Sequence, residues 1–224
     1  MRGSSKLEDC PLPSELFYDV DNDVWLRPLG GFTYRVGVAV PLLFKVGKLS
    51  NIKPRPVGTA VKKGQPLALL ESQRFTGSLW APLQGEIARI NEGVVAEPGK
   101  VAEDPYGDGW VVELKAHSDP KLAGLLTGED AIRRYEEKID REGIVCLKSY
   151  PDHRITALAE TCEMILTKVG DYFFKFVRPG ETLHVVTQDP ATEVDMLKWA
   201  RDMGQELVDM KRRGKLIHVL YRRL

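Results

Sequence analysis

The sequence has no surplus of charge of either sign and no long hydrophobic run. Its 224 residues contain 32 Lys and Arg against 32 Asp and Glu, a formal net charge of zero. Because nucleic-acid-binding proteins carry a clear basic excess, this balance argues against a nucleic-acid partner. The longest nearly apolar stretch, residues 36–44, contains Pro41 and is far shorter than the ~20 residues that span a bilayer. We therefore expect neither a nucleic-acid nor a membrane partner.

Cysteine is scarce, and the sequence opens without the apolar core of a secretory signal. The three cysteines, Cys10, Cys146 and Cys162, are too few for a disulfide framework and lack the spacing of metal ligands. A reducing cytoplasm is the simplest compartment for such a chain. We interpret Cys146, between Val145 and Leu147, as a core residue and place Cys10 in a loose tail.

The first half of the chain has the pattern of short strands separated by turns. Residues 1–16 are polar and interrupted by proline, and we interpret them as a flexible tail. Alternating or apolar runs bounded by Gly and Pro predict strands at 33–40, 65–70, 85–90 and 110–115. A helix is predicted to begin at Thr127 and to end at Gly143. Short strands at this spacing are typical of a small sandwich or barrel, and we interpret the helix as a solvated element lying on it rather than an interaction helix.

The last third of the chain differs in kind, and residues 144–154 are interpreted as a linker. From 155 to 224 the predicted order is strand, helix, strand, helix, strand, strand. The second of these helices is expected to start at Asp189, with Pro190 at its first position. This order predicts a two-layer α+β domain with both helices on one face of the sheet.

Several motifs in the first domain carry a resemblance to a known family. In chain order they are DVW at 23–25, VKKG at 61–64, ESQRFTGSLWAP at 71–82, GEI at 85–87, NE at 91–92 and EDPYGDGW at 103–110. With these motifs the region resembles the glycine cleavage system H protein over about residues 17–116, and less clearly to residue 143. The resemblance implies an all-β barrel-sandwich hybrid of the lipoyl/biotinyl type with a flanking helix. It also implies a lipoyl group on a lysine at a hairpin tip.

The reactive position of that motif is occupied by a different side chain. Members of the family read Glu-Ser-x-Lys, whereas this chain reads Glu71-Ser72-Gln73-Arg74. Lipoylation forms an amide and needs an amine that can lose a proton, and a guanidinium with a pKa above about 12 cannot supply one. Lys62 and Lys63 fall in the preceding turn. We therefore expect no lipoyl group and no other cofactor.

The same hairpin has two possible roles without a lipoyl arm. Arg74 offers a fixed cation to an acidic or phosphorylated partner surface, with Glu71 and Phe75 beside it, or it is a solvated residue inherited from a carrier ancestor. Phe75 and Trp80 slightly favour docking, because exposed aromatics are common interface anchors. They are equally compatible with packing inside the domain.

The second domain resembles the TusA family of sulfur carriers over about residues 155–224. The resemblance is carried by PGETL at 179–183, DPAT at 189–192, WAR at 199–201, Gly204 with Leu207, and the closing strand at 217–222. It implies a β-α-β-α-β-β fold and a carrier cysteine in a Cys-Pro-x-Pro motif that opens the first helix. The candidate is Cys162, but Glu163 and Ile165 stand in place of the prolines. The helix dipole would favour a thiolate there and Glu163 would oppose it, so Cys162 is either a sulfur carrier or a structural residue.

Other candidate sites are weaker. His184 and His218 are predicted on strands of one sheet, with His153 near its start, but a metal pair needs a third ligand. We expect no metal site. A basic C-terminal cluster could bind an anion or could be a solvated edge; its members are Lys211, Arg212, Arg213, Lys215, Arg222 and Arg223.

Three functions follow from these observations. The first is a non-lipoylated accessory in sulfur transfer or lipoate-linked metabolism, in which Cys162 passes sulfur and the first domain docks on enzymes of that metabolism. The second is a docking or scaffold protein with no chemistry of its own. The third is a genuine lipoyl carrier of glycine cleavage, which Arg74 opposes. In each case we expect a carrier or binding protein with protein partners rather than an enzyme.

Overall fold

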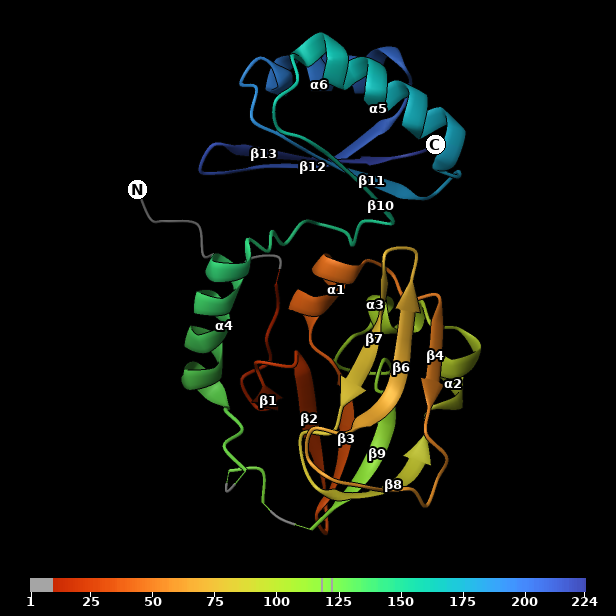
Figure 1. The fold of residues 1–224 in the computed structure, drawn as a ribbon, viewed down its shortest axis with the longest axis vertical. Helices are drawn as coiled ribbons and strands as arrows, with labels where there is room; N and C mark the ends of the chain where they lie inside the picture. Colours follow the sequence, from red (N-terminus) through yellow and green to blue (C-terminus); the bar gives the residue numbers. More distant parts are fainter. Residues whose placement is uncertain (1–9, 118, 122) are drawn as a thin grey trace. The chain divides into compact units, whose positions relative to one another are not determined.

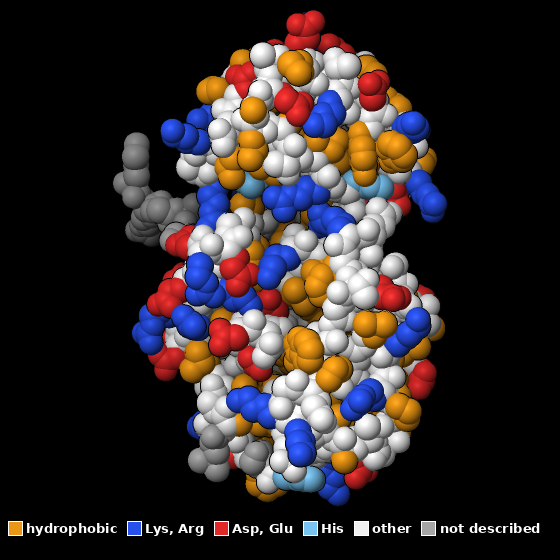
Figure 2. All heavy atoms as spheres, viewed as in Figure 1, with side chains coloured by type: hydrophobic (Ala, Val, Ile, Leu, Met, Phe, Trp, Pro, Cys, Tyr) orange, Lys and Arg blue, Asp and Glu red, His pale blue; other side chains and the backbone are white. Residues whose placement is uncertain are grey.

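The computed structural model describes residues 10–117, 119–121 and 123–224. The chain divides into two compact units, one that ends at Cys146 and one over Leu147–Leu224 (Figure 1). Acidic and basic side chains are interspersed on the face in view (Figure 2), as the balanced composition predicts. None of the helices in the described ranges has the length and apolar character needed to cross a bilayer.

The N-terminal unit is built from two antiparallel sheets. The larger sheet has the order β1 (Phe17–Asp19), β2 (Val24–Gly30), β3 (Thr33–Val38), β9 (Val112–Ala116), β8 (Gly85–Ile90), β5 (Ala60–Val61). The smaller sheet has the order β4 (Asn51–Pro54), β6 (Pro66–Ser72), β7 (Phe75–Trp80). Neither sheet closes into a barrel within the described chain.

Four helices accompany these sheets in the described part of the N-terminal unit. They are α1 (Val40–Val46), α2 (Glu92–Ala96), α3 (Lys100–Glu103) and α4 (Gly128–Glu142). The predicted limits of α4 are confirmed, since Thr127 is its N-cap residue and Gly143 ends it in the left-handed conformation at φ 66°. Thr127 makes no side-chain capping bond to the helix, and its Oγ1 donates to the carbonyl of Ser14 at 3.1 Å.

A buried ion pair holds α4 against the β1–β2 region. Lys138 Nζ lies 2.9 Å from Asp23 Oδ1, and both side chains are only 3% exposed. The same ammonium donates to the carbonyls of Val20, at 2.6 Å, and Asp21, at 3.0 Å. Burial raises the pKa of Asp23 to about 6, and Lys138 opposes that rise. The ion pair holds α4 in place. Because both charges are buried, losing one of them would leave the other unpaired away from water and would destabilise the fold.

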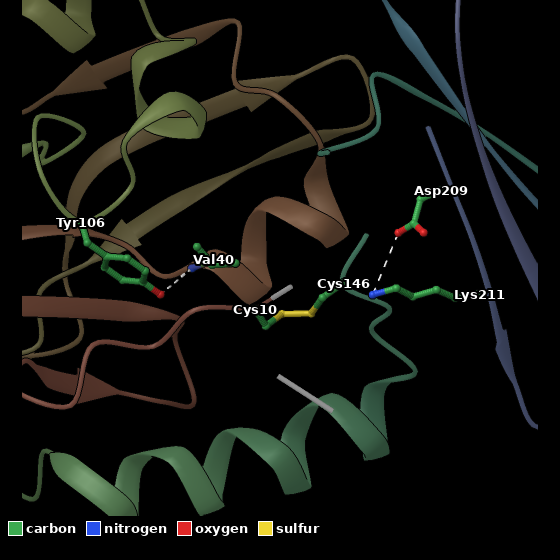
Figure 3. Close-up of a disulfide and its surroundings, with 6 residues drawn as sticks. All are labelled: Cys10, Val40, Tyr106, Cys146, Asp209 and Lys211. Atoms are coloured by element: carbon green, nitrogen blue, oxygen red, sulfur yellow. Dashed lines mark hydrogen bonds and ion pairs between the residues drawn. A yellow bond between two sulfur atoms is a disulfide. The ribbon is translucent and has the colours of Figure 1, made fainter. Parts of the chain in front are cut away.

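The structure corrects the expectation for two cysteines. Cys10 and Cys146 form a disulfide with their Cα atoms 5.5 Å apart (Figure 3). Cys10 and Leu16 are fully buried. Of the predicted tail, residues 1–9 lie outside the described residues, whereas residues 10–16 are held at both ends by the buried Cys10 and Leu16. A pairing across 136 positions leaves no local pattern in a sequence, so the cysteine count no longer supports a reducing compartment, and a cytoplasmic location stays a prediction.

The C-terminal unit has one four-stranded sheet covered on one face by two helices (Figure 1). Along the chain the elements are β10 (His153–Ala157), α5 (Cys162–Phe176), β11 (Thr182–Thr187), α6 (Thr192–Asp202), β12 (Glu206–Arg213) and β13 (Leu216–Arg222). The sheet order is β10-β11-β13-β12, with β10 and β11 parallel and the other pairs antiparallel. Helix α6 begins at Thr192, two residues later than Pro190, its expected first position, because residues 189–191 form the turn before it.

The core of the C-terminal unit lies between the helices and the sheet. Ile165, Val169 and Phe173 of α5 pack with Met196 and Ala200 of α6 against alternate strand residues. These alternate residues include Ile155, Leu183, Val185, Ile217, Val219 and Tyr221. The alternation along each strand therefore leaves the other side chains of the sheet on its opposite face.

Candidate functional site

The structure places Arg74 in the bend between β6 and β7, as the sequence predicts. Ser72 and Phe75 are cross-strand partners, so Gln73 and Arg74 form a two-residue connection. Arg74 is half-buried. Its Nε donates to the carbonyl of Val46 at 3.5 Å, and Ser72 Oγ donates to the same carbonyl at 2.7 Å. The bend is thereby anchored to the last residue of α1.

No amine of the preceding turn takes the place of residue 74. Lys62 and Lys63 precede β6, and the seven residues of that strand separate them from the bend by roughly 20 Å. Lys63 Nζ donates to the carbonyl of Ala123 at 2.7 Å. Because a guanidinium does not become a nucleophile near neutral pH, the side chains of the bend do not fit covalent attachment of a lipoyl group.

The side chains beside Arg74 are committed to local contacts. Asn51 Nδ2 donates to Glu71 Oε2 across the β4–β6 pair. The ring of Phe75 lies against Gly77, where an added Cβ would collide with it. Trp80 is 36% exposed and is an odd number of residues from Phe75, so the two aromatics lie on opposite faces of β7. Glu71 and Phe75 therefore support the hairpin, and Phe75 and Trp80 do not form one aromatic patch.

Cys162 occupies the first position of α5, as the sequence suggests, and its thiol has an acidic environment. Thr161 is the N-cap residue but makes no side-chain capping bond. The half-buried thiol donates to Asp195 Oδ2 at 3.0 Å. Burial and the Asp195 carboxylate raise the pKa of Cys162 to about 11, from an ordinary value of 9.0. The effect of the helix dipole is outweighed, and the thiol is protonated at neutral pH.

The carboxylate that adds to the effect of burial on this pKa was not identified from the sequence. We expected Glu163, the next residue along the chain, to oppose ionisation. The structure instead brings Asp195, from the first turn of α6, into contact with the thiol. Asp195 is 33 positions from Cys162, and only the packing of α5 beside α6 makes the two side chains neighbours.

Three histidines of the C-terminal unit lie within hydrogen-bonding distance of side chains in the same unit. His184 Nε2 and His218 Nδ1 lie 3.0 Å apart on neighbouring strands, and His153 Nε2 lies 2.8 Å from Glu181 Oε2. Burial, Arg154 and Arg213 lower the pKa of His218 to about 4. In the described ranges, no third metal-ligating side chain joins the His184–His218 pair.

Much of the basic C-terminal cluster is also internally paired. Arg212 Nη2 lies 2.8 Å from Glu193 Oε1, and Arg222 Nη1 lies 2.9 Å from Glu206 Oε2. Arg223 donates to carbonyls at the end of α5. Lys211 Nζ lies 4.0 Å from Asp209 Oδ2 (Figure 3). These contacts favour the interpretation of a charged structural edge.

Comparison with known proteins assigns the first unit. The family model described as glycine cleavage H-protein matches residues 16–138. Glycine cleavage system H protein 2 of Aquifex aeolicus is 40% identical over 138 residues, which cover 61% of this chain and 86% of that protein. Probable glycine cleavage system H protein 2 of Sulfolobus acidocaldarius is 34% identical over 140 residues, covering 62% and 94%.

Two solved structures are each similar to a part of the chain. A glycine cleavage system H protein from Mycobacterium marinum covers 59% of the chain and 99% of its own, with 24% identity and a TM-score of 0.48. A SirA-like protein from Desulfitobacterium hafniense covers 31% of this chain and 95% of its own, with 17% identity and a TM-score of 0.29. Both scores are below 0.5, so the assignment depends on the sequence matches. Through residues 16–138 this chain belongs to the glycine cleavage H-protein family.

Proposed function

We propose that this chain is a non-lipoylated member of the H-protein family that acts as an accessory in lipoate-linked or sulfur-transfer metabolism. On this proposal it docks on protein partners and carries no lipoyl group of its own. The observation that carries the proposal is Arg74 in the β6–β7 bend, where the family motif has its lysine. A guanidinium keeps a cation at this position but cannot form the amide.

Lipoylation in vitro tests this part of the proposal. The full chain is incubated with lipoate ligase, ATP and lipoic acid, and its intact mass is measured. We expect no adduct on the natural chain and one lipoyl adduct on Arg74→Lys, with Arg55→Lys as the matched control. An adduct on the natural chain would favour a genuine lipoyl carrier. An Arg74→Lys variant that stays unmodified would contradict the assignment of residue 74 to the attachment position.

We propose a TusA-like domain over residues 155–224, joined through residues 144–154 to the H-protein-like domain of 17–143. Its helix and strand order supports that proposal. Limited proteolysis tests the boundaries, and we expect the first cleavages to fall within 147–152, the part of that stretch between the disulfide residue Cys146 and strand β10. Protection of this stretch with cleavage inside either domain would contradict them.

Sulfur transfer at Cys162 is a second candidate function. It is favoured by the position of the thiol in the first turn of α5, and it is opposed by the Asp195 carboxylate. The balance supports docking without thiol chemistry, because the nucleophile in persulfide transfer is the thiolate. Persulfide trapping with Cys162→Ser as the control decides between them, and trapping that depends on Cys162 would establish the carrier role.

A further inference from the structure

Four charged residues form a row across the larger sheet of the N-terminal unit. Arg27 of β2 is the cross-strand partner of Arg35 of β3. Arg35 is the partner of Glu113 of β9, and Glu113 is the partner of Arg89 of β8. Cross-strand partners project from the same face of a sheet. We call Arg27, Arg35, Arg89 and Glu113 the arginine row.

The positive charge of the arginine row is not balanced within it. Glu113 Oε1 lies 3.4 Å from Arg35 Nε and 3.6 Å from Arg89 Nη1, so one carboxylate oxygen is shared by two guanidiniums. Arg27 lies opposite Arg35 in the strand register, not opposite a carboxylate. Like charges directly opposite each other destabilise a strand pair, so the Arg27–Arg35 pairing costs stability unless an anion lies between the two side chains.

Trp110 holds two of the guanidiniums in place. Arg35 Cζ lies 4.9 Å from the indole centroid and Arg89 Cζ lies 5.4 Å from it. The indole is 5% exposed, whereas the side chains of Arg35 and Arg89 are 31% and 64% exposed. Guanidiniums fixed on an aromatic face lose less freedom when they bind a carboxylate. The row is therefore both accessible and partly ordered before any partner binds.

We propose that the arginine row is a docking surface for an acidic segment of a protein partner. The row crosses four adjacent strands, which at ~4.8 Å per strand spans roughly 14 Å. That span along a sheet suits several spaced carboxylates better than one small oxyanion. This inference rests on the proposed docking function and specifies the partner as acidic. The surface does not include residue 74.

Binding of a labelled octaglutamate peptide to the full chain, followed by fluorescence anisotropy at low salt, tests the proposal. We expect binding that weakens as salt is added. Arg27→Gln, Arg35→Gln and Arg89→Gln should each weaken it by about two- to fivefold, the range for an exposed charge pair. The matched control is Arg55→Gln, which removes an exposed guanidinium next to β4.

Further variants keep the result interpretable. Glu113→Gln should tighten binding of the peptide, because it removes the only carboxylate of the row. If Arg35→Gln does not fold, Arg35→Lys takes its place, and it should retain most of the affinity because it keeps the positive charge. An equal loss in Arg55→Gln, or weaker binding by Glu113→Gln, would overturn the proposal. The proposal would also be overturned if a single-stranded oligonucleotide of equal length, or inorganic phosphate, displaced the labelled peptide at a lower concentration of negative charge than unlabelled octaglutamate does. Arg74→Lys should bind the peptide like the natural chain, so this assay and the lipoylation assay fail independently.

Discussion

The two units of this chain are stabilised in different ways. The N-terminal unit is closed by the Cys10–Cys146 disulfide and pinned by the Lys138–Asp23 ion pair. In the part of the chain that the structure describes, the C-terminal unit has neither device and keeps a free thiol at Cys162. Hydrophobic side chains show at the surface of both units in Figure 2. The N-terminal unit, whose family is known, is therefore stabilised by a covalent cross-link, whereas the C-terminal unit is stabilised by the packing of its core.

The difference extends to charge at the candidate sites. In the N-terminal unit, the arginine row has more cations than carboxylates. In the C-terminal unit, Asp195 accepts a hydrogen bond from the Cys162 thiol, and the charge of Asp189 also opposes ionisation of that thiol. The first arrangement favours an acidic partner, and the second suppresses thiolate chemistry.

Loss of the disulfide should produce the largest difference in stability between the two units. A ring of 136 residues restricts the unfolded chain by about 5 kcal/mol in the loop-entropy model. Cys10→Ser should therefore destabilise the N-terminal unit by about that amount and leave the C-terminal unit unchanged. Hydrogen exchange read by mass spectrometry, which assigns peptides to each unit, measures this, with Cys162→Ser as the control. Equal loss of protection in both units would contradict the comparison.

Removal of the buried cation should have the next largest effect. Lys138→Met leaves the Asp23 carboxylate without its partner and should cost about 3–5 kcal/mol, measured by urea unfolding. The exposed ion pair of Arg133 and Asp130 offers the control, since Arg133→Met should cost less than about 1 kcal/mol.

The deficit of Lys138→Met should depend on pH. The pKa of Asp23 in the folded chain, about 6, lies above its ordinary value of 3.8. Protonation of this carboxyl therefore favours folding, and its contribution is full below pH 3.8 and falls as pH rises through 6. Because Lys138 lowers this pKa, its removal should raise the pKa of Asp23 further, so the variant gains stability from protonation at a higher pH than the natural chain does. Its deficit should therefore shrink as the pH falls from 7 toward 5. A deficit that grows over this interval would show that Asp23 is not the group left unpaired.

Substitutions around Cys162 should have the smallest effect, which is a change in the reactivity of its thiol. With a pKa of about 11, its alkylation by iodoacetamide should be slow at pH 7 and rise with pH toward 11. Asp195→Asn should lower the pKa, and each unit of lowering increases the thiolate at pH 7 about tenfold. Asp202→Asn, at the other end of α6, is the matched control. An alkylation rate that Asp195→Asn leaves unchanged would show that burial alone governs the thiol.

Local sequence signals predicted the elements best. The N-cap position of Thr127 and the left-handed Gly143 place α4, and alternating residues place β11. The resemblance carried by the Glu-Ser-x-Arg motif implied that Arg74 lies at a hairpin tip, and in the structure it lies in the β6–β7 bend. These features depend on neighbours a few positions apart, which a sequence displays directly.

Features built from distant residues were not predicted. Cys10 meets Cys146, Asp195 meets Cys162, and Arg27, Arg35 and Arg89 gather around Glu113 only after strands and helices have paired. No local pattern marks any of these contacts, and in the first two cases the local interpretation of the cysteine was wrong or incomplete.

By itself, the sequence determined the family of the first unit and the absence of an acylatable amine at residue 74, because both depend only on which side chains follow one another. The tertiary structure decided the state of all three cysteines and the placement of charge on the larger sheet. The reason is physical: a thiol's reactivity and a guanidinium's balance are set by the groups within a few ångströms, and folding, rather than chain order, chooses those groups.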